Sequence, residues 1–99
     1  MDDKILYSLD ASMSIFRTQA IPGELTLYKD KIKFQAKGVL RGKEIKDTFY
    51  HSEIKKIKMG FSLMPYRITI YENNGDSWIF EQVYKKDGKI FVQKYEEIS

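Results

Sequence analysis

Hydrophobic and polar residues alternate with a period of two along much of the chain, a pattern typical of strands with one buried face. The pattern is clearest in GELTLYKDKIKFQAK, residues 23–37, where Lys29-Asp30 separates two alternating runs. We interpret this stretch as a β-hairpin with its turn at Lys29-Asp30. The inward positions are Leu25, Leu27, Ile32, Phe34 and Ala36, and the outward positions are Lys31, Lys33, Gln35 and Lys37.

The same period predicts strands on both sides of this hairpin. The stretch before it is compatible with helix or strand, and its alternation favours a strand at about 11–18. After the hairpin, KEIKDTFYH continues the alternation, with Ile45, Asp47 and Phe49 on one side. In SEIKKIKM the apolar phase slips between Ile54 and Ile57, which indicates a corner or bulge before a strand at about 54–59.

A second hairpin is predicted around the polar turn Asn73-Asn74-Gly75-Asp76. Its first strand, YRITIYE, places Ile68 and Ile70 on one face. Its second strand, DSWIFEQV, is apolar on both faces, as expected for a strand that is covered on two sides. The pattern places Trp78 and Phe80 opposite Ile79 and Val83.

The period becomes helical after residue 86, where Phe91, Tyr95 and Ile98 recur on one face and Asp87 is a candidate N-cap. The chain therefore reads as about seven short strands followed by one amphipathic helix. Seven antiparallel strands cannot all bury one face in a flat sheet. We predict a mainly β fold, a bent, partly open barrel of antiparallel strands capped by a C-terminal helix, with residues 1–99 as one domain.

Composition narrows the class of protein. A hydrophobic content of 42% and an aromatic content of 14% predict a folded chain, and the absence of Cys excludes disulfides and thiolate chemistry. No apolar run is long enough to cross a bilayer, and the acidic start does not resemble a signal peptide. The net charge of +3 permits an acidic partner without requiring one. These features indicate a cytoplasmic or cytoplasm-facing protein, with membrane association as an alternative.

Several stretches resemble the pleckstrin-homology-like (PH-like) family, in particular its GRAM and bacterial relatives. GELTLYKDKIKF is similar to the family's Gly-x-Leu-x-Leu-turn-x-Ile-x-Phe hairpin, YHSEIKKIKM to its entry to the fifth strand, and ITIYENNGDSWIF to its sixth and seventh strands. The resemblance extends from about residue 11 to residue 98. It implies the PH-like barrel and a binding module whose relatives bind membrane lipids, phosphoinositides or proteins, and whose bacterial relatives often form oligomers. A shared fold does not choose among these functions.

Catalytic and metal sites are not expected. The single histidine, His51, lies in the stretch His51-Ser52-Glu53, which we interpret as a polar corner with Ser52 capping the turn. Neighbours in sequence do not by themselves form a Ser/His/acid arrangement. The carboxylates lack metal-ligand spacing, and no Gly-rich phosphate loop is present. We therefore expect no enzyme activity and no cofactor.

Basic residues define one candidate site. The family topology would bring Arg17, Lys37, Arg41 and Lys43 together at the barrel end that some relatives use for lipid headgroups. The first loop offers only Arg17, fewer bases than phosphoinositide-binding relatives carry. The alternative interpretation is an ordinary solvated lysine face. No nucleic acid is expected, because the aromatic residues follow the core pattern and do not form an outward stacking platform.

An apolar segment defines the other candidate site. Phe61, Leu63 and Met64 form either an exposed surface for a partner or a plug that completes a small core. In the family this loop lies away from the lipid end. Our hypothesis is a non-catalytic PH/GRAM-like module for a protein partner or for self-association into a homo-oligomer. Peripheral binding to anionic membrane lipid through the basic loop end is the alternative.

Overall fold

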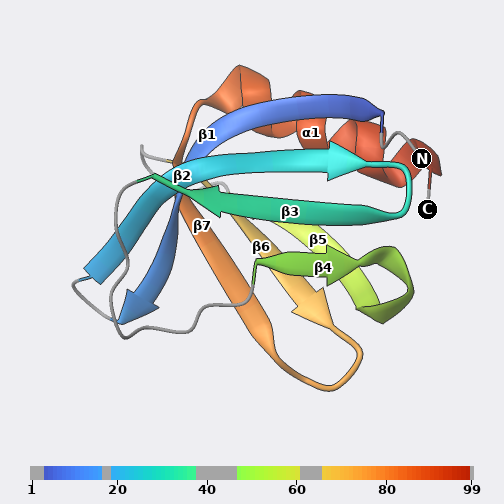
Figure 1. The fold of residues 1–99 in the computed structure, drawn as a ribbon, viewed down its shortest axis with the longest axis horizontal. Coiled ribbons are helices and arrows are strands. Elements are labelled where there is room, and N and C mark those ends of the chain that lie inside the picture. The colour runs from blue at the N-terminus through green and yellow to red at the C-terminus, as the bar shows by residue number, and fades with distance from the viewer. Residues whose placement is uncertain (1–3, 17–18, 38–46, 61–65, 99) are drawn as a thin grey trace.

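The computed structural model describes residues 4–16, 19–37, 47–60 and 66–98 of the chain. Within these ranges it contains seven strands, one 3₁₀ turn and a C-terminal α-helix (Figure 1). The elements are β1 (Ile5–Phe16), β2 (Gln19–Tyr28), β3 (Lys31–Ala36), β4 (Thr48–Tyr50), η1 (His51–Glu53), β5 (Ile54–Gly60), β6 (Tyr66–Glu72), β7 (Ser77–Val83) and α1 (Lys85–Ile98).

All seven strands belong to one antiparallel sheet that does not close into a complete barrel. The strand order is β4-β3-β2-β1-β7-β6-β5, so β4 and β5 are its edges. The strand β1 pairs with β2 along nearly its whole length, from Ile5 to Phe16. Its pairing with β7 is much shorter and consists of Ser12↔Glu81 and Met13↔Phe80. The sheet therefore consists of two halves, β4-β3-β2-β1 and β7-β6-β5, which are joined by the short pairing between β1 and β7.

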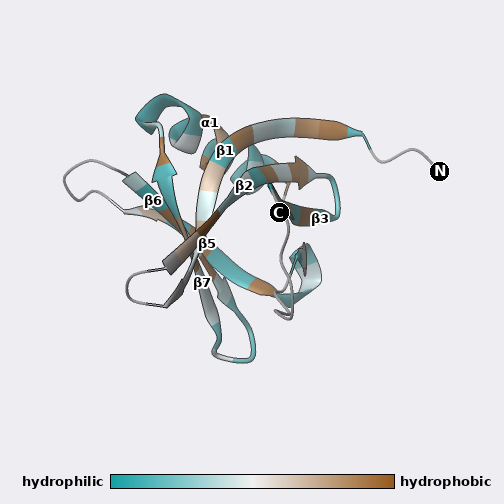
Figure 2. Cartoon of the chain, turned by 60° about the vertical axis from the view of Figure 1, so that its left-hand side comes forward, coloured by the Kyte–Doolittle hydropathy of each residue, from teal (hydrophilic) through white to brown (hydrophobic). Residues whose placement is uncertain are grey.

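The two halves fold over one shared aromatic core. The centroid of the Phe80 ring on β7 lies 5.4 Å from that of Phe34 on β3 and 5.9 Å from that of Phe49 on β4. The Phe49 ring also lies 5.8 Å from Trp78. Strands at distant places in the strand order thus meet face to face, which requires a strongly bent sheet. Figure 2 shows hydrophobic and hydrophilic residues interspersed along the strands, as the period-two pattern predicts.

The fold class and both predicted hairpins are confirmed. The strands β2 and β3 flank Lys29-Asp30, and Leu25 and Phe34 are buried as paired residues. In the β6–β7 turn, Gly75 has a φ of 98°, a left-handed conformation that glycine adopts without steric penalty. Its backbone N–H donates to the Glu72 carbonyl at 3.0 Å. The first strand begins at Ile5, earlier than the predicted 11–18, and ends at Phe16.

The strand β7 departs from simple alternation. The sequence pattern placed Phe80 and Val83 on opposite faces, but both are buried. Gln82 has a φ of 60°, and the register with β6 shifts between the pairs Tyr66↔Val83 and Ile68↔Phe80. This bulge inserts an extra residue and turns Val83 back to the face of Phe80. The prediction was wrong because alternation assumes an unbroken ladder.

The corner before β5 is confirmed, with two local corrections. The register with β6 shifts between Ile54 and Lys56, so Ile54 and Ile57 are both buried. The 3₁₀ turn η1 precedes this bulge, and no side chain caps it, so the predicted cap from Ser52 is wrong. Asp47, predicted to face inward, is exposed, because β4 begins only at Thr48.

The helix α1 packs on β1, β5 and β6 through Phe91 and Tyr95. It begins before Asp87, so the predicted N-cap is wrong, and Asp87 instead accepts a hydrogen bond from the Tyr7 hydroxyl at 2.7 Å. A Cβ on Gly88 would lie 2.9 Å from Met59 Cε and 3.1 Å from Val83 Cγ1, so glycine permits the close approach of α1 to the sheet. In the described ranges, no helix has the length and apolar character needed to span a bilayer.

Candidate functional site: the groove between β5 and α1

The strand β5 is the edge of the sheet nearest to α1. It pairs with β6 on one side, and within the described residues no strand pairs with it on the other. Its buried residues are Ile54 and Ile57, whereas Lys55, Lys56 and Lys58 are exposed. An edge strand presents a row of backbone donors and acceptors along its unpaired side, which makes it a template for another strand.

A groove of about 530 Å³ runs beside this edge. One wall comes from η1 and β5, and the other comes from the last turns of α1. Tyr95, on the helix wall, is 6% exposed and belongs to the hydrophobic core. The groove thus combines a strand edge with three buried apolar residues, Ile54, Ile57 and Tyr95, and the rest of its lining is polar or charged. Its lining residues are His51, Ser52, Ile54, Lys55, Lys56, Ile57, Tyr95 and Glu96.

His51 joins the two walls of the groove. Its backbone N–H donates to the Asp30 carbonyl at 3.0 Å, and its ring meets the Tyr95 ring edge-on, with centroids 5.1 Å apart. The Nε2 atom is buried, and no described residue accepts or donates a hydrogen bond there. Burial lowers the pKa of His51, although a hydrogen bond with the Lys31 backbone and the Asp30 charge act in the opposite direction. The ring is therefore held neutral as a packing residue of the β2–β3 turn, η1 and α1.

The exposed side of β5 is basic. Lys56 and Lys58 are paired in register with Tyr71 and Thr69 on β6. The Lys56 ammonium lies 5.3 Å from the centroid of the Tyr71 ring, within the range of a cation–π contact. This contact keeps the Lys56 side chain over the outer face of the β5–β6 pair.

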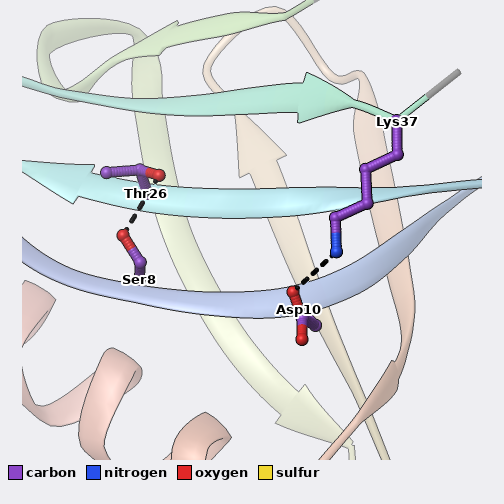
Figure 3. A network of polar contacts seen from close by, with 4 residues as sticks. All are labelled: Ser8, Asp10, Thr26 and Lys37. Carbon is purple, nitrogen blue, oxygen red and sulfur yellow. Dashed lines mark hydrogen bonds and ion pairs between the residues drawn. The ribbon is translucent and has the colours of Figure 1, made fainter.

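The structure tests few of the site residues predicted from the sequence. Phe61, Leu63 and Met64 lie outside the described residues, so their choice between core plug and partner surface stays open. Arg17, Arg41 and Lys43 also lie outside them. Lys37 is described and exposed, and its Nζ donates to Asp10 Oδ1 at 3.2 Å (Figure 3). The clustering of bases at the barrel end therefore stays a prediction.

Two side-chain bonds cross between strands on the outer face around Lys37. Figure 3 shows Lys37 reaching across β2 to Asp10 on β1, while the Ser8 hydroxyl donates to the Thr26 hydroxyl at 3.3 Å. A depression of about 410 Å³ on this side is lined by Thr26, Tyr28, Lys33, Phe34, Gln35, Ala36 and Asp47. No helix contributes a wall to it.

The β6–β7 hairpin carries a smaller polar depression of about 260 Å³, lined by Ser52, Glu53, Glu72, Asn73 and Asn74. The buried carboxylate of Glu72 accepts a hydrogen bond from the indole N–H of Trp78 at 2.8 Å. It is therefore engaged in holding the hairpin together. Among the described residues, no cluster of His, Asp and Glu has the composition of a metal site.

Sequence reasoning missed the groove itself. Helical spacing predicts Tyr95 only as a core residue of the helix, and the site residues predicted from the sequence do not include Lys55 or Lys56. The available signal was the density of lysines in IKKIKMG, which is typical of an edge strand. The sequence could not show that α1 would stand beside that edge.

The chain matches no family model and no curated protein. Among solved structures it is similar to the C-terminal domain of an unknown protein from Leishmania infantum, with a TM-score of 0.71. The two share 14% sequence identity, and the match covers 95% of this chain and 83% of the other. The similarity establishes a shared fold.

Proposed function

We propose that this protein is a non-catalytic binding module of the PH-like class, which recruits a protein partner by adding an extended segment of that partner to the open edge of β5. The observation that carries the proposal is the juxtaposition of the β5 edge, with which no described strand pairs on its outer side, and a groove wall that contains the buried ring of Tyr95. Main-chain hydrogen bonds to an edge strand provide affinity, and side-chain pockets beside it provide specificity.

The PH-like assignment is supported by the order of the elements. The bent antiparallel sheet is followed by a helix that packs against β1, β5 and β6, as the resemblance implies. The helix is also anchored rather than loosely attached, since Asp87 binds Tyr7 and Gly88 lies against Met59. At the other end of the helix, the buried Tyr95 packs against the His51 ring, so the helix wall of the groove is also held against η1.

Self-association through the same edge is less favourable than binding of a different protein. Two β5 strands pairing edge to edge would bring their lysines, Lys55, Lys56 and Lys58, into proximity. Like charges opposite one another destabilise a strand pair. We therefore favour a heterologous partner over a homo-oligomer at this site.

The test uses extended peptides selected from a random display library, followed by backbone amide hydrogen exchange of the complex. We expect selected peptides to slow exchange in β5, residues 54–60, and to leave β4, residues 48–50, unchanged. The strand β4 is a built-in control because it is the other edge of the same sheet. Protection at β4 or elsewhere, without protection at β5, would contradict the proposal, as would a failure to select any binder.

A further inference from the structure

The two faces of β5 differ in chemistry, and the difference specifies what kind of strand fits beside it. From Lys56 onward the strand alternates regularly: Lys56 and Lys58 are exposed, Ile57 is buried, and Met59 is half-buried. Met59 faces the helix, since its side chain would contact a Cβ at Gly88. One face of β5 is thus basic and solvated, and the other is apolar and turned toward α1.

An added strand would present its own side chains alternately to these two faces. Side chains on the inner face would meet Ile57 and Tyr95, which are 5% and 6% exposed and line the groove. His51 adds a neutral aromatic ring at the same wall. Apolar side chains gain most from such an environment, because they leave water without burying a polar group.

Side chains on the outer face would lie beside Lys56 and Lys58. Directly opposed residues in neighbouring strands have Cβ atoms about 4.5–5.5 Å apart, and opposite charges at that distance stabilise the pair. The β5 segment itself, IKKIKMG, contains no acidic residue. The Tyr71 ring holds the Lys56 ammonium on this face, which reduces the freedom lost when a carboxylate binds it.

We infer that the segment bound at β5 is an extended peptide in which acidic and apolar residues alternate, with the acidic residues on the side of Lys56 and Lys58 and the apolar residues facing Ile57 and Tyr95. This inference rests on the proposed function and specifies its partner. It gives the lysines of β5 a selective role in addition to their effect against edge-to-edge aggregation.

The test compares four labelled synthetic peptides of equal length by fluorescence anisotropy, with amide exchange to locate each complex. Three alternate valine with glutamate, glutamine or lysine. The fourth contains the valines and glutamates in two blocks, so its composition matches that of the first while its acids fall on both faces. We expect the alternating glutamate peptide to bind β5 about tenfold more tightly than the glutamine peptide at low salt, with the gap narrowing as salt is added.

Charge reversal on β5 provides the decisive variant. In K56E/K58E we expect the preference to invert, so that the alternating lysine peptide binds more tightly than the glutamate peptide. The matched control is K29E/K33E, which makes the same change in net charge at exposed positions of the β2–β3 hairpin. This control should retain the preference of the unmodified protein.

Each contrary outcome has a separate meaning. Equal affinity of the glutamate and glutamine peptides for β5 at low salt would overturn the inference and leave the proposed function intact. Inversion of the preference by K29E/K33E would also overturn the inference, because it would show attraction to net charge alone. Equal binding of the block peptide would show that alternation is irrelevant. If no peptide from the set or from the display library protects β5, the proposed function itself fails.

Discussion

The outer face of β1–β3 and the β5–α1 edge are both polar at their surfaces, yet they differ in how those polar groups are satisfied. In the first region β2 is paired on both sides, and side chains bond to one another, as in Lys37–Asp10 and Ser8–Thr26 (Figure 3). In the second region β5 is paired on one side among the described strands, and a groove that includes the buried residues Ile54, Ile57 and Tyr95 lies beside it. The comparison teaches that surface charge alone does not mark a binding site. A strand edge without a described partner strand, beside buried apolar side chains, is the stronger indication.

The contrast exists within one small domain because the two regions share a core. Phe80 on β7 joins the two halves of the sheet, since its ring packs against Phe34 of β3 and Phe49 of β4. The edge strand β5 is linked to this packing through β6, because Met59 pairs with Ile68 and Ile68 pairs with Phe80. Ile57, Ile68 and Phe80 all belong to the same hydrophobic core.

The largest expected effect comes from removing that shared ring. Phe80→Ala should lower the free energy of unfolding by about 3–5 kcal/mol, because it leaves a cavity between the two halves of the sheet. Urea unfolding monitored by Trp78 fluorescence and by far-UV circular dichroism measures the change. The half-buried neighbour Ile79→Ala should have a smaller effect. Two separate unfolding transitions in the unmodified protein would show that the regions do not share one cooperative core.

A smaller effect is expected where a single hydrogen bond joins β1 to α1. Tyr7→Phe should cost about 1 kcal/mol, since it removes the donor to Asp87 and leaves the ring in place. Amide exchange in the first turn of α1 should accelerate. The control Tyr84→Phe, at a residue that is 71% exposed, should change neither quantity. Unchanged exchange in Tyr7→Phe would mean that packing alone positions the helix beside β5.

The smallest effect is a pH dependence at the open edge. Burial lowers the pKa of His51 below its ordinary value of 6.5, so the unfolded chain binds a proton more readily than the folded one. Stability contributed by the neutral ring is fully present above pH 6.5 and is lost as the pH falls below it. Urea midpoints across this range should decline in the unmodified protein and decline less in His51→Gln. Equal declines would place the responsible group elsewhere.

The sequence determined which residues face the core wherever a regular element continues. Period-two alternation was sufficient for the β2–β3 hairpin, and helical spacing correctly placed Phe91 and Tyr95 on the buried face of α1. Ile98, predicted on the same face, is 37% exposed at the end of the helix. The phase slip at Ile54 and Ile57 even located a bulge, because two core residues three positions apart require one. These features are local, so a single chain records them.

The tertiary structure alone decided two features of the protein. One is where a bulge interrupts strand pairing although the hydrophobic pattern gives no sign of it, and the other is which elements become neighbours. The turn of Val83 onto the face of Phe80 depends on the backbone at Gln82, which no hydrophobic period reveals. The contact of His51 with Tyr95 joins residues from η1 and α1, and it builds the groove beside β5. Alternation records that a face is buried, but it does not record what covers that face. For this protein, the covering helix is what turns an ordinary lysine-rich edge into a candidate binding site.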